Sequence, residues 1–132
     1  MPEIPDLKVV CGDESVDALR GSVVWRYEDD EIRDTKPEFW QRQDETPCLK
    51  LSDTKKVNLQ FDMEPLEVFV QCWSVEYWGT LADEVIDVEV RGTTFELLDG
   101  EYVYEVSARW QGNDEEGGTL SGFVYYSFCT EK

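Results

Sequence analysis

The sequence predicts an all-β protein built as an antiparallel β-sandwich, and two observations carry this prediction. Short runs rich in β-branched and aromatic residues recur about every ten residues, with no helical pattern between them. In addition, residues 102–110 place an apolar or small side chain at every second position, which is the period of a half-buried strand. Together these patterns argue against a parallel α/β sheet.

The clearest element is a hairpin near the end of the chain. Asp99-Gly100 provides a turn, residues 102–110 form a strand, and 119–129 form its partner after a polar, glycine-rich loop. Tyr102 follows Gly100 by two residues at the start of the penultimate strand. This is the position of a tyrosine corner, in which the hydroxyl bonds back to the preceding turn, and equally a position where any β-rich sequence favours Tyr.

The other elements follow in chain order. Strands at 7–11 and 22–27 form a two-stranded N-terminal extension, and a long acidic loop covers 28–45. Within that loop, Pro37 suits the first position of one or two helical turns over 37–43. The remaining strands are predicted at 46–52, 57–61, 66–75, 85–90, 93–97, 102–110 and 119–129.

From Thr46 onward these elements have the number and spacing of an immunoglobulin-like core of about seven strands. We therefore expect one domain over 1–132, divided into N-terminal strands (1–27), the acidic loop (28–45) and the immunoglobulin-like core (46–132). Three tryptophans are assigned to the core: Trp25, Trp73 and Trp110.

Composition limits the partners. The chain has 12 Lys and Arg against 30 Asp and Glu, and its net charge of −18 repels phosphate backbones and anionic membrane surfaces. Nucleic acid is therefore excluded as a partner. No apolar run approaches the roughly 20 residues of a membrane span, so this segment does not insert directly into a membrane.

The sequence contains few residues that could form a catalytic site. The chain has no His, which excludes Ser-His-Asp and Cys-His sites and histidine-bearing metal catalysts, and it has no glycine-rich phosphate loop. A pair of carboxylates remains possible in principle, but a small sandwich rarely offers the deep cleft that raises a carboxylate pKa. Residues 113–116 carry oxygen ligands suitable for calcium, yet adjacent side chains seldom converge on one ion. We expect no enzyme, no cofactor and no metal.

The sequence contains four cysteines, and none is spaced as Cys-x-x-Cys. We expect one or two disulfides in an exported protein, with the pairing left open among three full connectivities. Cys72 and Cys129 lie in apolar strands and could instead be buried thiols, whereas Cys11 and Cys48 lie at strand edges.

Large aromatic side chains outside the strand alternation are the best candidates for a binding surface. Phe39 and Trp40 lie in the acidic loop, and Tyr77 and Trp78 follow the strand at 66–75. Internally, these rings could plug the open end of the sandwich. Functionally, they could stack on sugar rings or anchor a protein partner.

Four stretches, residues 18–25, 57–61, 100–110 and 122–128, resemble a domain of poorly characterised bacterial lipoproteins and cell-envelope proteins. The shared features are an early Gly-Ser/Thr-x-x-Trp, here at 21–25, and a late Ala-x-Trp followed by Tyr-x-Phe. The resemblance covers nearly the whole chain. It implies export, a signal or lipid anchor upstream of Met1, and a β-sandwich, but no activity. The four cysteines and the acidic loops depart from the pattern.

The sequence therefore favours a non-enzymatic extracytoplasmic domain that mediates protein contacts or serves as a structural module. The alternative is a carbohydrate-binding module that uses Trp40, Tyr77 and Trp78 to stack on polysaccharide. A weaker third hypothesis is an inhibitor that presents the 28–45 loop to an enzyme.

Overall fold

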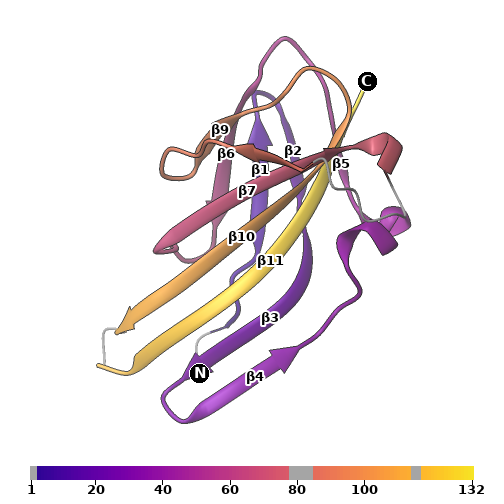
Figure 1. The fold of residues 1–132 in the computed structure, drawn as a ribbon. Coiled ribbons are helices and arrows are strands. Elements are labelled where there is room, and N and C mark those ends of the chain that lie inside the picture. The colour runs from indigo at the N-terminus through magenta and orange to yellow at the C-terminus, as the bar shows by residue number, and fades with distance from the viewer. Residues whose placement is uncertain (1–2, 78–84, 114–116) are drawn as a thin grey trace.

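A computed structural model describes residues 3–77, 85–113 and 117–132, and they form two β-sheets packed as a sandwich (Figure 1). The described strands are β1 (Leu7–Cys11), β2 (Glu14–Asp17), β3 (Leu19–Tyr27), β4 (Asp30–Asp34), β5 (Cys48–Lys50), β6 (Lys56–Phe61), β7 (Glu67–Ser74), β8 (Ile86–Val88), β9 (Thr94–Glu96), β10 (Tyr102–Asn113) and β11 (Thr119–Glu131). Short 3₁₀ turns are η1 (Phe39–Gln41), η2 (Gln43–Glu45) and η3 (Val75–Tyr77). The predicted all-β sandwich is confirmed.

The two sheets differ in size. The smaller has four strands in the order β2-β1-β6-β9, and its pairs are antiparallel. The larger has seven strands in the order β4-β3-β11-β10-β7-β8, with β5 added parallel to β11. Strand β11 is therefore flanked on one side by β10 and on the other by β3 and then β5.

The predicted C-terminal hairpin is present and longer than its sequence pattern. Strands β10 and β11 pair without interruption from Val103 and Cys129 to Asn113 and Thr119. Past the alternating segment, residues 111–113 of β10 still pair with β11, and residues 129–131 of β11 pair with β5. This hairpin forms the centre of the larger sheet.

The alternation along β10 determines which side chains reach the core. Tyr104, Val106, Ala108 and Trp110 point inward and are buried, as the period of two predicts. The inward residues of both sheets form one cluster, which includes Trp25. The ring of Trp25 meets Trp110 edge-on at 5.6 Å and lies so close to Gly122 that a Cβ there would clash with it.

The N-terminal strands do not form the expected extension. β1 lies inside the four-stranded sheet, and β3 lies between β4 and β11 in the larger one. Two strands were missed, β2 and β4. The residues of β4 are all exposed and lie within the predicted acidic loop, so they carry no apolar alternation. β4 forms because its backbone pairs with β3 as an edge strand.

The structure decides the open interpretation of one aromatic residue and corrects the assignment of another. The hydroxyl that bonds back to the preceding turn belongs to Tyr104, which accepts a hydrogen bond from the Leu98 amide at 3.0 Å, and not to Tyr102. Trp73 lies on the outer face of the larger sheet, half-buried, rather than in the core. It alternates with the buried Val70 and Cys72, so its strand position points it away from the other sheet.

A disulfide joins Cys48 on β5 to Cys129 on β11, which confirms one predicted bridge and fixes its partners. The two residues are direct partners in the parallel pair, with their Cα atoms 4.3 Å apart. The bridge closes a loop of 81 residues, which corresponds to about 4 to 5 kcal/mol of lost entropy in the unfolded chain. Cys11 and Cys72 are buried free thiols, and burial raises the pKa of both.

Candidate functional site

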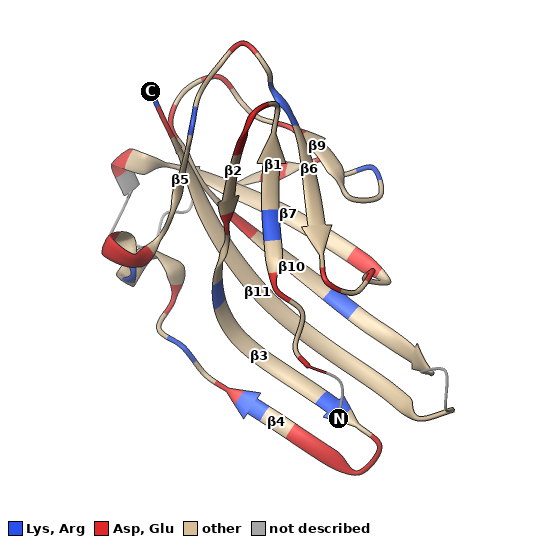
Figure 2. Cartoon of the chain, turned by 180° about the vertical axis from the view of Figure 1, so that it is seen from behind, with Lys and Arg blue, Asp and Glu red and all other residues tan. Residues whose placement is uncertain are grey.

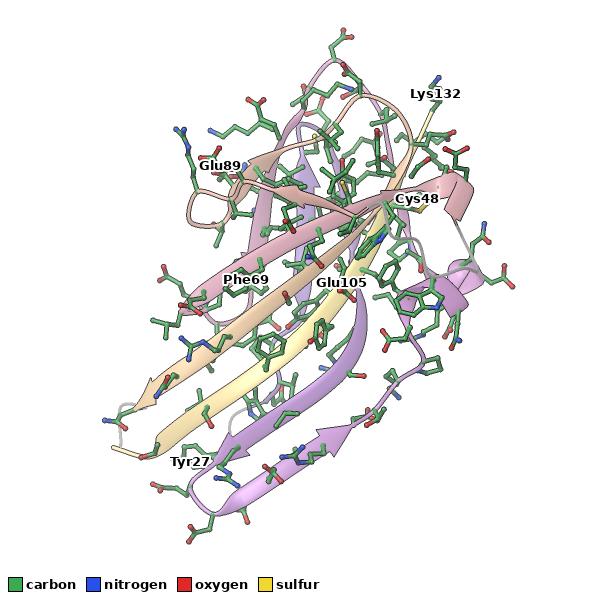
Figure 3. The ribbon with its side chains drawn as sticks, viewed as in Figure 1. Tyr27, Cys48, Phe69, Glu89, Glu105 and Lys132 are labelled. Atoms are coloured by element: carbon green, nitrogen blue, oxygen red, sulfur yellow. A yellow bond between two sulfur atoms is a disulfide. The ribbon has the colours of Figure 1, made fainter. Side chains whose placement is uncertain are left out.

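The outer face of the seven-stranded sheet carries aromatic side chains that the sandwich does not cover (Figure 3). The strand register places Phe69 of β7, Ser107 of β10 and Tyr125 of β11 in one row across the sheet. Phe69 is 53% exposed and Tyr125 is 39% exposed. A small serine therefore lies between two accessible rings.

The next row adds a carboxyl group. Gln71 of β7 pairs with Glu105 of β10, which pairs in turn with Ser127 of β11. Glu105 and Ser107 are two residues apart and point to the same face of the sheet. We call the group formed by Phe69, Gln71, Glu105, Ser107 and Tyr125 the Glu105 site. It lines an open depression of about 620 Å³ that extends to the edge strand β8.

The environment of Glu105 opposes its ionisation. Burial, together with the nearby charge of Glu38, raises the pKa of the Glu105 carboxyl to about 7. Burial also raises the pKa of Tyr125, with a further contribution from the Glu105 and Glu38 charges. The site thus holds an acidic group that titrates near neutrality beside two exposed rings.

The nitrogen donors nearest the Glu105 carboxyl are already engaged, whereas the Ser107 and Tyr125 hydroxyls make no hydrogen bond within the described residues. The Gln71 amide donates to Asp87 on β8 at 2.9 Å. One row beyond the site, the Arg109 guanidinium donates to Glu67 at 3.0 Å and to Gln111 at 3.1 Å. Among the described residues, none donates a hydrogen bond to the Glu105 carboxyl. The site therefore offers an acceptor and has no spare cation.

One end of this face is closed by the segment that contains η1. Phe39 is buried and packs on Trp73 with ring centroids 4.7 Å apart, and it also contacts Val103 and Cys129. Trp40 is half-buried and meets Phe39 edge-on at 5.1 Å. These rings form a wall at the disulfide end of the sheet.

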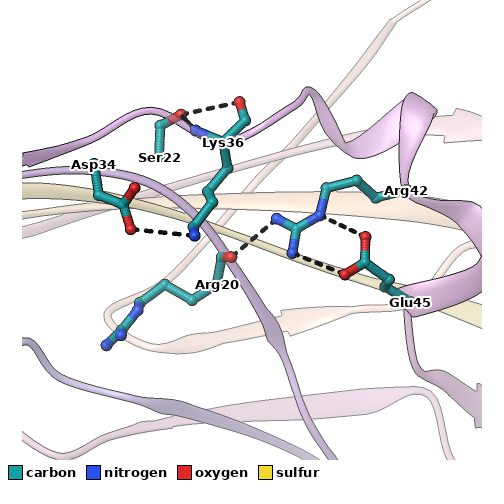
Figure 4. A network of polar contacts seen from close by, with 6 residues as sticks. All are labelled: Arg20, Ser22, Asp34, Lys36, Arg42 and Glu45. Atoms are coloured by element: carbon teal, nitrogen blue, oxygen red, sulfur yellow. Dashed lines mark hydrogen bonds and ion pairs between the residues drawn. The ribbon is translucent and has the colours of Figure 1, made fainter.

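A polar network holds this wall against β3 (Figure 4). The Arg42 guanidinium donates to the Arg20 carbonyl at 3.1 Å and to Glu45 at 3.0 Å, and the hydrogen bond from Arg42 lowers the pKa of Glu45. The Ser22 hydroxyl accepts from the Lys36 amide at 3.0 Å. Glu38 immediately precedes η1 and lies in the chain between Lys36 and Arg42, the two residues that bond to β3. These bonds hold Glu38 near Glu105.

The sequence-predicted binding residues only partly come together. Phe39 and Trp40 lie side by side in the wall, where Phe39 is buried against Trp73 on the outer face of the larger sheet. Tyr77 ends η3, and its side chain is outside the described part of the chain, as is all of Trp78. Glu105, Phe69 and Tyr125 were not predicted. They occupy the alternate positions of β7, β10 and β11 that point away from the core. Once the core-facing residues of a strand are identified, its outward-facing residues are also known.

A second depression of about 640 Å³ lies between the edge strands of the two sheets, β8 and β9. Ile86, Val88 and Phe95 line it together with charges of both signs. Within residues 3–77, 85–113 and 117–132, no group of three or more Cys, Asp or Glu side chains is arranged to hold a metal ion. Residues 114–116, part of the calcium candidate, lie outside that range.

Comparison of the chain with protein-family models, with characterised proteins and with solved structures finds no match. In the described residues, no helix is both long and apolar enough to span a membrane. The site must therefore be interpreted from its own geometry.

Proposed function

We propose that this protein is a non-enzymatic binding module that acts outside the cytoplasm and holds a protein partner on the Glu105 site. The observation that carries the proposal is the pair of exposed rings, Phe69 and Tyr125, beside a half-buried carboxyl on the outer face of the larger sheet. Exposed aromatic side chains on a rigid scaffold are typical of the residues that dominate binding energy at protein interfaces.

An immunoglobulin-like fold is part of this proposal. The order β11-β10-β7-β8 matches the G-F-C-C′ order of the variable-type larger sheet, with the hairpin β10–β11 in the place of F and G. The bond from the Leu98 amide to Tyr104 near the start of β10 is what a tyrosine corner on strand F provides. Domains of this architecture commonly serve as binding or spacer modules.

An extracytoplasmic location fits the chemistry of the disulfide. The Cys48–Cys129 bridge links two strands of the larger sheet, and structural disulfides persist in oxidising compartments. Attachment to a membrane through an upstream signal or lipid anchor remains part of the proposal. The acidic surface, spread over loops and over β4 (Figure 2), suits a protein that must stay dissolved.

The proposal is tested by placing a photo-crosslinking amino acid at position 69, in cells that make the protein. We expect one discrete protein adduct that disappears when Tyr125→Ser is added. The matched control is the same crosslinker at position 58, since Asn58 is exposed on the outer face of the four-stranded sheet. Equal adducts from both positions would contradict the proposal. Retention on cell-wall polysaccharide that depends on Phe69 would support the carbohydrate-binding alternative instead.

A further inference from the structure

We infer that the Glu105 site takes an arginine side chain from a basic protein partner, with its guanidinium between Phe69 and Tyr125 and paired to the Glu105 carboxylate. This inference rests on the proposed function and specifies the chemistry of its partner. It follows from the geometry of the row, from the Glu105 carboxyl that no described residue pairs, and from the charge around the site.

The row provides a slot of suitable size. Phe69, Ser107 and Tyr125 lie on three adjacent strands, so the outer two backbones are roughly 10 Å apart at the usual strand spacing of about 4.8 Å. Ser107 leaves the space between the rings open. A guanidinium is flat and stacks on aromatic faces, and its N–H groups form a fork that matches a carboxylate.

The unused polar groups select a donor. The Gln71 amide and the Arg109 guanidinium are committed to Asp87 and Glu67, while the Glu105 carboxyl receives no hydrogen bond from the described residues. A sugar could use the Ser107 and Tyr125 hydroxyls as donors, so the preference for a guanidinium rests on the unpaired carboxyl and on the charge around it. A guanidinium only donates, and its parallel N–H groups match the two oxygens of an ionised carboxylate.

The electrostatic field favours the same ligand. Among the residues that the structure describes, the charged and titratable groups that face Glu105 are Glu38 before η1, Tyr125 on β11 and, beyond Gln71, Asp87 on β8. The nearest guanidinium on its own strand, that of Arg109, is held by Glu67. With a chain charge of −18, the approach of a basic segment is favoured and that of an acidic one is opposed.

This pairing predicts a pH dependence with a definite sign. In the free protein the pKa of Glu105 is about 7, so the carboxyl is about one-tenth ionised at pH 6 and nine-tenths ionised at pH 8. A bound cation favours the ionised form. The affinity for an arginine ligand is therefore expected to rise about tenfold from pH 6 to pH 8, with release of a proton on binding at pH 6.

The test uses the whole chain, ¹⁵N-labelled, and a short capped peptide, acetyl-Gly-Arg-Gly-amide. Its neutral isostere, with citrulline for arginine, has the same shape without the charge. We expect the arginine peptide to shift the amide resonances of Glu105, Ser107 and Tyr125, with a dissociation constant about tenfold lower at pH 8 than at pH 6. Glu105→Gln should weaken binding at pH 8 by at least tenfold and remove the pH dependence.

Glu14→Gln is the matched control, because it removes the same charge from the exposed β2 edge of the other sheet. Equal weakening by Glu14→Gln and Glu105→Gln would mean that only net charge matters, and it would overturn the inference. Equal binding of the citrulline peptide at the site would also overturn it while leaving the binding face intact. If neither peptide shifts the resonances of the site, the arginine inference is overturned. The proposed function is then still judged by the crosslinking experiment.

Discussion

The two outer faces of this sandwich differ in the side chains that they expose to solvent. On the four-stranded sheet, β1 and β6 expose Lys8, which pairs with the exposed Gln60, and Asn58, which pairs with the half-buried Val10. On the seven-stranded sheet, β7 and β11 expose Phe69 and Tyr125. Both faces arise from the same alternation, and each inner face packs on the other sheet. The outward positions are therefore where a sandwich can acquire a binding surface without changing its core.

Removal of the disulfide is expected to change the free energy of unfolding the most. Replacing both Cys48 and Cys129 by Ser should lower the free energy of unfolding by about 4 to 5 kcal/mol, because the 81-residue loop is then unconstrained in the unfolded chain. It should also loosen the Phe39 wall over Trp73. Urea denaturation followed by tryptophan fluorescence measures both effects.

Reduction of the wild-type protein should reproduce this loss, and the double variant should not respond to reductant. A loss below about 1 kcal/mol would show that the bridge contributes little to holding the larger sheet together.

Replacement of the Glu105 carboxyl on the larger sheet is expected to have the next largest effect on the free energy of unfolding. The folded-state pKa of Glu105 is about 7, above its ordinary value of 4.5, so the protonated form is favoured by folding. The associated stability is fully present below about pH 4.5 and is lost as the pH rises through 7. Glu105→Gln should therefore unfold with a free energy about 2 to 3 kcal/mol higher than wild type at pH 8 and equal to it at pH 4.

Asp17→Asn tests whether this effect is confined to one face, since Asp17 is exposed on β2 at the edge of the smaller sheet. It should change the free energy of unfolding by less than about 0.5 kcal/mol at either pH. A pH-independent effect of Glu105→Gln in urea titrations would contradict the raised pKa.

The exposed ring gives the smallest effect on folding. Phe69→Ser should alter the free energy of unfolding by no more than about 1 kcal/mol, because the ring packs on little of the core. The same variant should reduce binding of a hydrophobic dye to the folded protein. Thermal denaturation and dye fluorescence measure the two properties, and a loss of several kcal/mol would place Phe69 among the core residues.

The fold was predictable where side chains alternate and less so where only the backbone pairs. The period of two revealed β10 and the hairpin, because half of their side chains are buried. β4 gave no such signal, since an exposed edge strand needs no apolar residue. Trp73 was wrongly assigned to the core because β7 carries large side chains on both of its faces. The sequence does not indicate which of these faces packs against the other sheet.

The candidate site was harder to predict for a related reason. Phe69, Glu105 and Tyr125 are far apart in the sequence and are brought together only by the register of three strands. Phe39 and Trp40 lie outside the strand alternation, which made them candidates, and they form the wall of the site. Rings within the alternation were assigned to strands and were not considered as ligand contacts.

The position of the disulfide has a mechanical consequence. The two chain ends lie at opposite ends of the sandwich (Figure 1), so tension applied between them would run along its length. The covalent link from Cys48 to Cys129 would carry that tension past the whole intervening segment. Strands β6 to β10, which include most of the Glu105 site, would then stay unloaded while β1 to β4 yield first.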